Sequence, residues 1–217
     1  MQRDDGIEAI SLYVDCVAAR QGTMTIATIT LVRHGMTAWA AAGRHTSVTD
    51  VALTSAGEAQ ARALKPCLAE TQFDAVYSSP MLRARDTAIL AGFANATLDA
   101  DLAEWRYGRY EGKATMEILE EDPNWSVFRN GAPGGETPSQ VVERCDRLLR
   151  LWQQKDHHHI LCFSHGHLLR ALTTRWICQD IGLGNHLHLD PGRIARLGWA
   201  HRMPALHQWN SCSTQTG

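Results

Sequence analysis

The sequence predicts an α/β fold, a three-layer α/β/α sandwich with a mainly parallel sheet. Apolar runs of strand length alternate along the chain with segments of helical periodicity, a pattern that favours a parallel sheet with helices on both faces. Two of these runs, 26–32 and 160–163, each lead into a polar segment that contains a His-Gly pair. The chain has 217 residues, of which 44% are hydrophobic and 20% are charged, which is typical of one ordinary globular domain.

The first strand and the first helix are marked by an apolar run and a capping pattern. The run Ile26–Val32 predicts a buried strand. Ser55 and Glu58 form a capping-box pattern for a helix that continues to about Ala69. The apolar face of that helix is expected to consist of Ala59, Ala63, Leu64 and Cys67.

A second strand and helix follow directly. Residues Phe73–Tyr77 predict the strand, and a Ser-Ser-Pro turn then starts a helix over Met81–Leu90, which Gly92 ends. The stretch 93–136 is less regular and contains a short helix near 114–121.

The next helix has the clearest start in the chain. Thr137 and Gln140 form another capping box, and Pro138 occupies the first helical position. The helical pattern continues to about Gln154.

The C-terminal third returns to strands. The run Ile160–Phe163 predicts a strand, and Leu168–Leu172 predicts the helix after it. Short β-like runs follow at Ile194–Trp199 and Ala205–Trp209, separated from their surroundings by Pro191-Gly192 and by Pro204.

Residues 1–22 are expected to form an N-terminal extension of unknown role, followed by one domain over 23–217. The extension is too short and too charged for a membrane helix and lacks the pattern of a signal peptide, and Met24 is an alternative start. The six cysteines include no CxxC pair, so we expect all six to be reduced packing residues of a cytoplasmic protein. With 21 basic and 23 acidic residues, the composition gives no indication of nucleic acid or membrane binding.

The polar segments at the strand ends carry the expected chemistry. Open α/β sheets bind ligands at the carboxyl edge of their strands. His34 is the candidate nucleophile, because a neutral imidazole can accept a phosphoryl group and later release it to water. Arg33 and Arg83 would stabilise phosphate charge, and a protonated His165 would add a donor. Gly166 opens a helix, so its amide is expected to point at the anion.

Three carboxylates are candidates for a general acid that protonates the leaving group. Glu104 or Glu111 would serve if partial burial raised its pKa, and the residues alone do not choose between them. Glu136 is a third candidate, but a loop or helix-start carboxylate near Thr137 is the favoured interpretation.

The motifs together resemble the histidine phosphatase superfamily, the phosphoglycerate-mutase-like group. They occur in the family's order over about residues 26–209: Arg33-His34-Gly35-Met36-Thr37, Gly43-Arg44, Leu53-Thr54-x-x-Gly57, Ser79-Pro80-x-x-Arg83-Ala84-x-x-Thr87, Gly134-Gly135-Glu136 and Ser164-His165-Gly166. The resemblance implies that His34 becomes phosphorylated and that Arg33, Arg83 and His165 hold the phosphate. It also implies that Glu104, in the family's Leu-x-Glu position, is the proton donor.

The chain also resembles one subgroup, the broad acid phosphatases of bacteria and the fungal sedoheptulose-1,7-bisphosphatase type. Two segments carry this resemblance: Gly43-Arg44-His45-Thr46-x-x-Thr49-Asp50 and Glu104-Trp105-x-Tyr107-Gly108-x-Tyr110-Glu111-Gly112. The pattern of this subgroup implies that Thr46 and Tyr107 line the substrate pocket. The chain departs from it at Ala40, where many relatives have Asn or Ser, and at Arg106, where Asp is frequent. Ala40 removes a contact to the phosphate. Arg106, if it lies at the pocket mouth rather than in solvent, favours a substrate with a second anionic group.

Three alternatives compete with a phosphatase. A phosphoglycerate mutase would share the phosphohistidine, but the stretch from Glu104 to Gly135 lacks the insertion with an arginine pair that the resemblance associates with mutases. A metal-dependent hydrolase would use histidine clusters, of which the chain offers 157–159, 165/167 and 186/188. A non-catalytic phosphate-binding module would have lost the nucleophile or the acid, and candidates for both are present.

The sequence thus predicts a metal-independent phosphomonoester hydrolase that needs no cofactor. The expected partner is a small phosphate ester, such as a sugar phosphate or a sugar bisphosphate, and neither nucleic acid nor membrane. The physiological substrate stays open, and a homodimer is one oligomeric state that the sequence leaves open.

Overall fold

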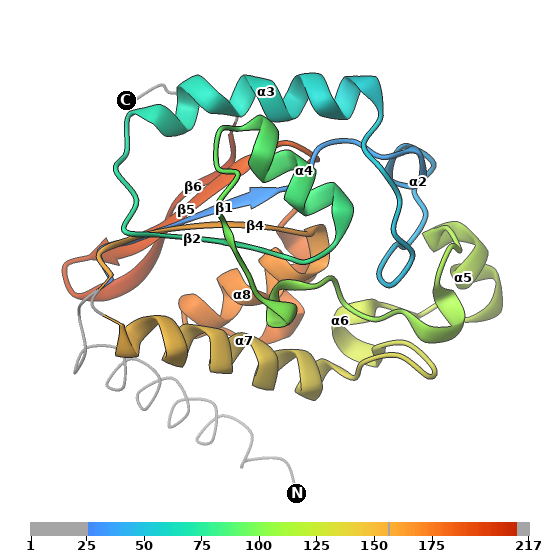
Figure 1. Cartoon of the computed structure of the whole chain (residues 1–217). Coiled ribbons are helices and arrows are strands. Elements are labelled where there is room, and N and C mark those ends of the chain that lie inside the picture. The colour runs from blue at the N-terminus through green and yellow to red at the C-terminus, as the bar shows by residue number, and fades with distance from the viewer. Residues whose placement is uncertain (1–25, 156, 212–217) are drawn as a thin grey trace, which may run out of the picture.

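Six strands form one sheet in the order β3-β2-β4-β1-β5-β6, with the first strand near its centre (Figure 1). The computed structural model describes residues 26–155 and 157–211, and the predicted extension over 1–22, like Met24, lies outside them. The strands are β1 (Thr28–Arg33), β2 (Ala75–Ser78), β3 (Thr97–Leu98), β4 (His159–Ser164), β5 (Ile194–Ala200) and β6 (Met203–Ser211).

The sheet is parallel on one side and antiparallel on the other. Strands β1, β4, β2 and β3 run parallel to one another, whereas β5 is antiparallel to β1 and β6 is antiparallel to β5. A tight turn with positive φ at His201 and Arg202 joins β5 to β6, and turns of this kind suit the twist of a hairpin. The predicted three-layer sandwich with a mainly parallel sheet is confirmed.

Helices cover both faces of the sheet. Helices α3 and α4 lie on one face, and α7 and α8 lie on the other (Figure 1). The longer helices are α3 (Ser55–Ala69), α4 (Leu82–Leu90), α7 (Pro138–Gln154) and α8 (Gly166–Trp176). Shorter elements are α2 (Ala38–Ala41), α5 (Thr115–Glu121), α6 (Val127–Asn130), and the 3-10 helices η1 (Ala100–Leu102), η2 (Gly108–Tyr110) and η3 (Ile181–His186).

Alternate strand residues build the two cores. In β4, Ile160 and Cys162 join the larger cluster with α7 and α8, while Leu161 and Phe163 join the smaller cluster with α3 and α4. This is the expected result for a strand covered on both sides, because successive side chains point to opposite faces. The rigid centre of the sheet therefore fixes the ends of β1 and β4.

Helix α3 spans the predicted residues, but its cap and its buried face differ from the prediction. The N-cap is Thr54, whose hydroxyl accepts the amide of Gly57, so the predicted capping box of Ser55 and Glu58 is wrong by one position. Ala59 and Ala63 are exposed, and Ala61 and Leu68 are buried instead; Leu64 and Cys67 are buried as predicted. Such errors arise because successive side chains are rotated by about 100° around the helix axis, so a small error in the pattern selects a different face.

The cap of α7 agrees with the prediction in full. Thr137 and Gln140 exchange the two hydrogen bonds of a capping box, and Pro138 is the first helical residue. The helices predicted over 81–90 and near 114–121 are also confirmed, as α4 and α5.

Pro204 lies inside a strand rather than between strands. It belongs to β6, where it pairs with Trp199 of β5. Strand β6 is at the edge of the sheet, and an edge strand tolerates a residue without an N–H. The prediction that Pro204 separates the C-terminal runs is therefore wrong.

Among the cysteines that the structure describes, Cys178 departs from the predicted reduced state. Cys67, Cys145 and Cys162 are buried thiols, as expected for packing residues. Cys178 is disulfide-bonded, so the prediction that all six are reduced is wrong. Sequence spacing could not reveal this bond, because a disulfide depends on which residues meet in space. Cys16 and Cys212 lie outside the described residues.

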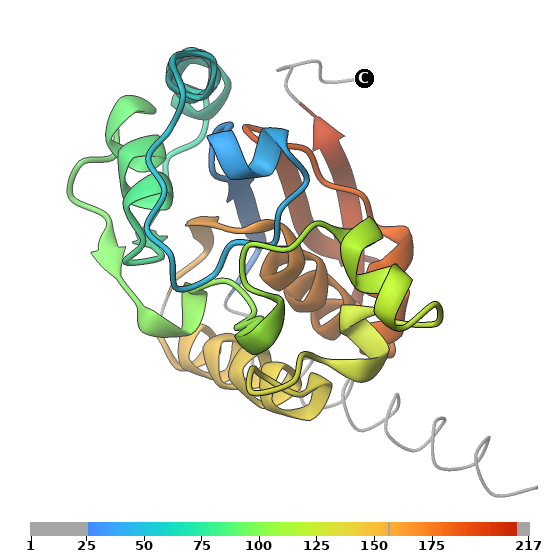
Figure 2. The same ribbon diagram turned by 90° about the vertical axis from the view of Figure 1, so that its right-hand side faces the viewer.

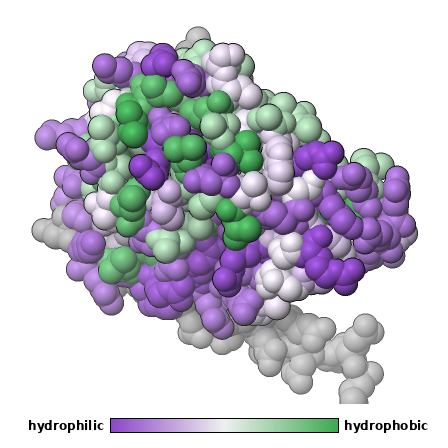
Figure 3. Space-filling model, turned by 45° about the vertical axis from the view of Figure 1, so that its right-hand side comes forward, coloured by the Kyte–Doolittle hydropathy of each residue, from purple (hydrophilic) through white to green (hydrophobic). Residues whose placement is uncertain are grey.

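The surface is mixed in character. The large apolar side chains that are exposed come from separate segments, and the face in Figure 3 shows hydrophobic residues interspersed with hydrophilic ones. None of the helices in the described ranges combines the length and the apolar character that crossing a membrane requires.

Candidate active site

The carboxyl ends of the parallel strands bring the predicted site residues together. In the register of β1 and β4, Arg33 pairs with Ser164, so His34 and His165 follow at neighbouring strand ends. Their rings lie with centroids 5.2 Å apart. Figure 2 looks onto this end of the molecule, where α2 and the segments around α5 and α6 surround the strand ends. The prediction that two distant His-Gly segments form one site agrees with this geometry.

A cavity of about 170 Å³ opens at these strand ends. Six of the eight predicted site residues line it, namely Arg33, His34, Thr46, Glu104, Tyr107 and Gly166. The lining also includes Thr37, Ala40, Gly43, Arg44, His45, Thr115, His167 and Arg170. Arg83 and His165 are fully buried behind this lining.

His34 is arranged as a neutral nucleophile. Its Nδ1 lies 2.8 Å from the carbonyl oxygen of Gly35, and because a carbonyl only accepts, Nδ1 carries the proton. Nε2 therefore keeps its lone pair. Burial, and then the charges of Arg33 and Arg83, lower the pKa of His34 well below 6.5. The ring is thus neutral at neutral pH, which a nitrogen nucleophile requires.

His165 is arranged as a neutral ring as well, so the condition under which it would add a charged donor is not met. Arg83 Nε donates to His165 Nδ1 at 3.2 Å, so the ring proton lies on Nε2, which is 2.8 Å from the Ser79 hydroxyl. Burial and the charge of Arg83 lower the pKa of His165 well below 6.5. A cation directly against the ring opposes a second positive charge there.

Arg83 connects His165 to the loop before α3. Its terminal nitrogens donate to the carbonyls of Thr46, Ser47 and Thr49 at 3.1–3.2 Å. The guanidinium thus holds three carbonyls of the loop that carries Thr46, in addition to the imidazole.

The carboxylate of Glu104 sits at the start of α8. It accepts the backbone amides of Trp105, His167 and Leu168 at 2.8–3.0 Å. The N-terminus of α8 was expected to point at a bound anion through Gly166. Gly166 does line the cavity, but the next two amides of the helix are occupied by Glu104. A carboxylate at a helix N-terminus is favourable because the amides and the dipole match its charge.

The other two acid candidates lie elsewhere. Glu111 accepts the amides of Ser47 and Thr49 and so holds the loop from outside the cavity. Glu136 is buried against Arg144 at 2.9 Å and does not line the cavity either. Glu104 is the one carboxylate among the lining residues of the cavity.

The cavity contains Arg33, as predicted, and two cations that the sequence did not single out. Arg106 does not line the cavity; its side chain is 62% exposed and lies 3.8 Å from Glu136. The sequence left open whether Arg106 lies at the pocket mouth or in solvent, and the structure shows the second arrangement. Arg44 and Arg170 line the cavity instead. Ala40 lines it as predicted.

Arg170 is held in place by two contacts that sequence reasoning missed. Its Nε donates to the carbonyl of Gly184 at 2.7 Å, and its guanidinium lies 4.8 Å from the centre of the Phe128 ring. The helical run Leu168–Leu172 was recognised, but residues 128 and 184 are too distant in sequence to have indicated this packing.

Two further histidines of the lining form an aromatic layer with Tyr107. His45 and His167 stack with centroids 5.6 Å apart, and the Tyr107 hydroxyl lies 2.5 Å from His167 Nδ1. Burial lowers the pKa of His45 to about 4 and that of His167 well below 6.5. These rings are neutral, so they offer hydrogen bonds rather than charge.

The histidine clusters considered as metal ligands do not assemble. Within residues 26–155 and 157–211, no three His, Cys, Asp or Glu side chains converge in an arrangement that would hold a metal ion. The runs 157–159, 165/167 and 186/188 all lie within these ranges.

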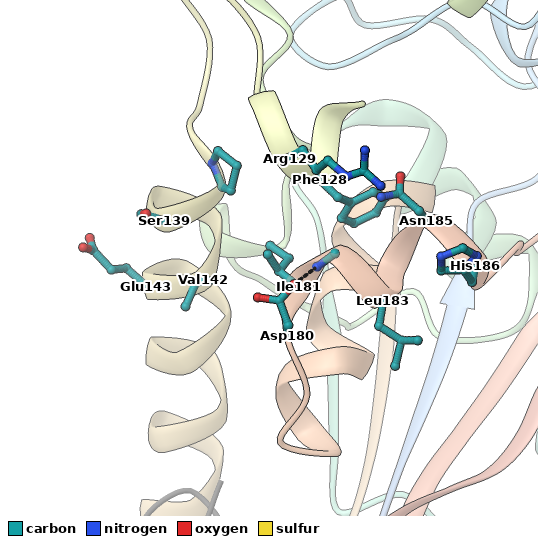
Figure 4. Close-up of a pocket in the computed structure, with 12 residues that line it drawn as sticks. Phe128, Arg129, Ser139, Val142, Glu143, Asp180, Ile181, Leu183, Asn185 and His186 are labelled. Carbon is teal, nitrogen blue, oxygen red and sulfur yellow. Dashed lines mark hydrogen bonds between the residues drawn. The ribbon is translucent and has the colours of Figure 1, made fainter. Parts of the chain in front are cut away.

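A larger hollow of about 860 Å³ lies between α6, α7 and η3 (Figure 4). None of the predicted site residues lines it. Phe128 borders this hollow, and Arg170, which covers the Phe128 ring, borders the cavity. The stacked pair therefore separates the two.

Comparison with known proteins agrees with this geometry. The sequence model of the histidine phosphatase superfamily (branch 1) matches residues 29–212. An acid phosphatase of Mycobacterium tuberculosis is 40% identical over 174 residues, which cover 79% of this chain and 86% of the relative. The sedoheptulose 1,7-bisphosphatase of Saccharomyces cerevisiae is 33% identical over 186 residues, covering 71% of this chain and 67% of the relative. The solved structure of an open reading frame product of Mycobacterium tuberculosis superposes with a TM-score of 0.82 at 37% identity, over 85% of this chain and 97% of that one.

Proposed function

Because this chain belongs to the histidine phosphatase superfamily (branch 1), it is a phosphatase of the histidine type, and we propose that it hydrolyses phosphate monoesters through a phosphohistidine at His34 without a metal ion. One observation carries the proposal. The proton of His34 is held on Nδ1 by Gly35, which leaves Nε2 as a nucleophile in a cavity whose lining includes one carboxylate, Glu104.

In the first step, His34 Nε2 attacks phosphorus and the bond from phosphorus to the ester oxygen breaks. The leaving oxygen takes a proton from Glu104, which acts as general acid. In the second step, Glu104 accepts a proton from water as the water oxygen attacks phosphorus, and the bond to His34 breaks. Inorganic phosphate leaves, and both residues return to their starting states.

Charge on the phosphoryl oxygens is stabilised by the two arginines and by Gly166. Arg33 Nε is buried and has no hydrogen-bond partner in the structure, so it is available to a phosphate oxygen. Arg83 and His165 act from behind His34, where low polarity strengthens the field of a guanidinium. Phosphoryl transfer needs chiefly such positioning and charge stabilisation.

The proposed substrates are small phosphorylated metabolites, such as sugar phosphates or bisphosphates. The cavity of about 170 Å³ suits a small ester, with Thr46 and Tyr107 among its walls. Arg44 and Arg170 provide positive charge there in addition to Arg33, so a second anionic group on the substrate would find a partner. A relative named sedoheptulose 1,7-bisphosphatase is in keeping with such a substrate.

The test is phosphate release from a panel of monoesters and bisphosphates in excess EDTA, with His34→Ala alongside. We expect release that persists in EDTA and disappears in the variant, together with an acid-labile phosphoprotein when the wild-type enzyme is quenched during turnover. Activity that EDTA abolishes and added metal restores would contradict the proposal, as would full activity of His34→Ala. Interconversion of phosphoglycerates without phosphate release would favour the mutase alternative.

The cytoplasm stays the predicted location. The disulfide at Cys178 argues against it, because disulfides rarely persist in reducing compartments. Counting the free thiols of protein taken from intact cells distinguishes a reducing from an oxidising compartment. A disulfide-bonded Cys178 in that protein would exclude a reducing compartment.

A further inference from the structure

The backbone that carries Glu104 has no regular secondary structure. It runs between η1 and η2, and residues 103–107 belong to neither a helix nor a strand. A general acid must stay within hydrogen-bond reach of the oxygen that it protonates. Backbone without a helix or ladder to hold it needs other partners to keep such a position.

Arg144, which projects from α7, holds the N-terminal side of this segment. Its Nη1 donates to the carbonyls of Asp101 and Ala103 at 2.9 and 2.5 Å. The carbonyl of Ala103 belongs to the peptide bond that leads into Glu104. One guanidinium nitrogen thus fixes two carbonyls directly before the acid.

Glu136 holds the C-terminal side. Its carboxylate accepts the amide of Arg106 at 2.9 Å, and its own amide donates to the carbonyl of Arg106 at 2.8 Å. Its carbonyl accepts the indole N–H of Trp105 at 2.9 Å. The approach is close enough that a Cβ at Gly135 would lie 2.0 Å from the carbonyl oxygen of Arg106.

The two holding residues are joined to each other. Arg144 Nη2 lies 2.9 Å from Glu136 Oε2, and the two side chains are only 8% and 6% exposed. Burying an ion pair costs desolvation free energy. Removing one of the two partners leaves the other as an unpaired buried charge. The pair is therefore costly to form, and its hydrogen bonds go to the peptides on either side of the buried Glu104.

We propose that Glu136 and Arg144 form a buried positioning pair that aligns Glu104 with the leaving oxygen. Neither residue lines the cavity that contains His34; both line a separate hollow of about 370 Å³, which Glu104 also borders. The inference rests on the proposed role of Glu104 as general acid. Glu136 of the Gly-Gly-Glu motif and Arg144 of α7 would thus support one chemical step, the protonation of the leaving group.

The test compares esters with good and poor leaving groups. An alkyl phosphate needs the acid, whereas 4-nitrophenyl phosphate releases a stable anion that does not. For Glu136→Gln and Arg144→Lys we expect kcat/KM, which reports formation of the phosphohistidine, to fall by about 100-fold with the alkyl ester, the effect of an ångström-scale misplacement, and by about threefold or less with the nitrophenyl ester. Equal losses with both esters, or no loss, would overturn the proposal.

Arg147 provides a matched control. It lies on the same helix and pairs with the side chain of Asp101 at 2.7 Å, but no hydrogen bond of its side chain goes to the backbone of the acid segment. Arg147→Met should leave the ratio between the two esters at the wild-type value. A changed ratio in this variant would show that loss of any ion pair at α7 alters the preference between the two esters. That result would overturn the specific positioning role of Glu136 and Arg144.

A double variant addresses folding. Single substitutions leave a buried charge unpaired, whereas replacing both partners by apolar residues of similar volume is often neutral for stability. The double variant Glu136→Leu with Arg144→Met should therefore fold, which its melting temperature would show. It should still lose activity with the alkyl ester selectively. A folded double variant with the wild-type ester ratio would overturn the proposal.

Failure of the positioning role can be distinguished from failure of the proposed phosphohistidine mechanism. Phosphoprotein formation from 4-nitrophenyl phosphate depends on His34 and not on the pair. If it is absent from the wild type, the phosphohistidine mechanism fails and the positioning role with it. If it is present while the ester ratio does not respond, the positioning role alone fails.

Discussion

A single carbonyl decides the reactive form of the nucleophile. The Gly35 oxygen can only accept, so it fixes the proton of His34 on Nδ1 and leaves Nε2 free to attack. The sequence could indicate the nucleophile because it follows directly after a strand at the ligand-binding edge. It could not indicate the tautomer, which depends on the path of the backbone one residue later.

The additional positive charge of the cavity comes from residues that sequence reasoning did not single out, Arg44 and Arg170. Arg106 was noticed because it interrupts a motif, yet the irregular segment turns it outwards. Arg170 lies within a helical run, where an arginine is ordinarily a solvated residue, and its orientation depends on Phe128 and Gly184. Positions next to a strand end could be predicted, whereas positions fixed by remote packing could not.

Substitution of Arg170 should therefore change substrate preference. We expect Arg170→Met to lower kcat/KM for a sugar bisphosphate by at least about tenfold more than kcat/KM for 4-nitrophenyl phosphate, since a hydrogen bond to a charged group contributes roughly 1.5–3 kcal/mol. Steady-state kinetics on both substrates measures the ratio. The control is Arg106→Met, which removes a cation outside the cavity and should leave the ratio unchanged. A ratio that responds to Arg106 and not to Arg170 would reverse our assignment.

The start of α3 connects an element to the site. The Thr54 hydroxyl accepts the amide of Gly57 and donates to the carbonyl of Met36, two residues after His34. A Cβ at Gly57 would lie 2.1 Å from that same carbonyl oxygen, so the helix packs directly on the backbone. The cap therefore holds the loop of the nucleophile as well as the helix.

Substitutions at the two adjacent hydroxyl residues test which one caps α3. Thr54→Ala should lower the free energy of unfolding by about 1 kcal/mol, the usual cost of losing an N-cap. Ser55→Ala, at the exposed first helical position, should change it by no more than about 0.5 kcal/mol. Urea denaturation of both variants measures the difference. A larger loss at Ser55 would restore the capping box that the sequence suggested.

Helices with local signals could be predicted better than those without. The start of α7 depends on residues within one turn, Thr137, Pro138 and Gln140, and its prediction is confirmed. Short elements such as α6 and β3 have no such signal and were missed, because long-range packing stabilises them. Between them lies the segment of Glu104, which the resemblance to the family identified and periodicity did not.

At the scale of the whole molecule, the layers could be predicted and the strand directions only in part. Alternation of strands and helices predicts the parallel half, since each helix returns the chain to the same edge. Strands β5 and β6 follow one another without a helix, so they form an antiparallel hairpin. This half lies beside β1 but contributes no residue to the cavity lining.

Four histidines whose pKa values are lowered make the fold sensitive to acid. Burial is the first cause that lowers the pKa values of His34, His45, His165 and His167. Each histidine takes up a proton near pH 6.5 when the chain is unfolded but only at lower pH when it is folded. Between those values the unfolded state binds more protons, so stability is full above about pH 6.5 and falls as the pH decreases.

The size of this effect can be stated for His45. Its pKa falls from 6.5 to about 4, which corresponds to about 3 kcal/mol of stability lost on passing from neutral pH to pH 4. A domain of ordinary stability, about 5–15 kcal/mol, with three further imidazoles of lowered pKa should therefore unfold in mild acid. We expect the free energy of unfolding, from urea titrations at pH 8, 7, 6 and 5, to be flat at first and then to fall steeply below about pH 6.5. His45→Gln should reduce the slope by up to about 1.4 kcal/mol per pH unit. Stability that is unchanged from pH 7 to pH 5 would mean that these imidazoles take up protons in the folded protein, and it would remove the basis for a neutral nucleophile at His34.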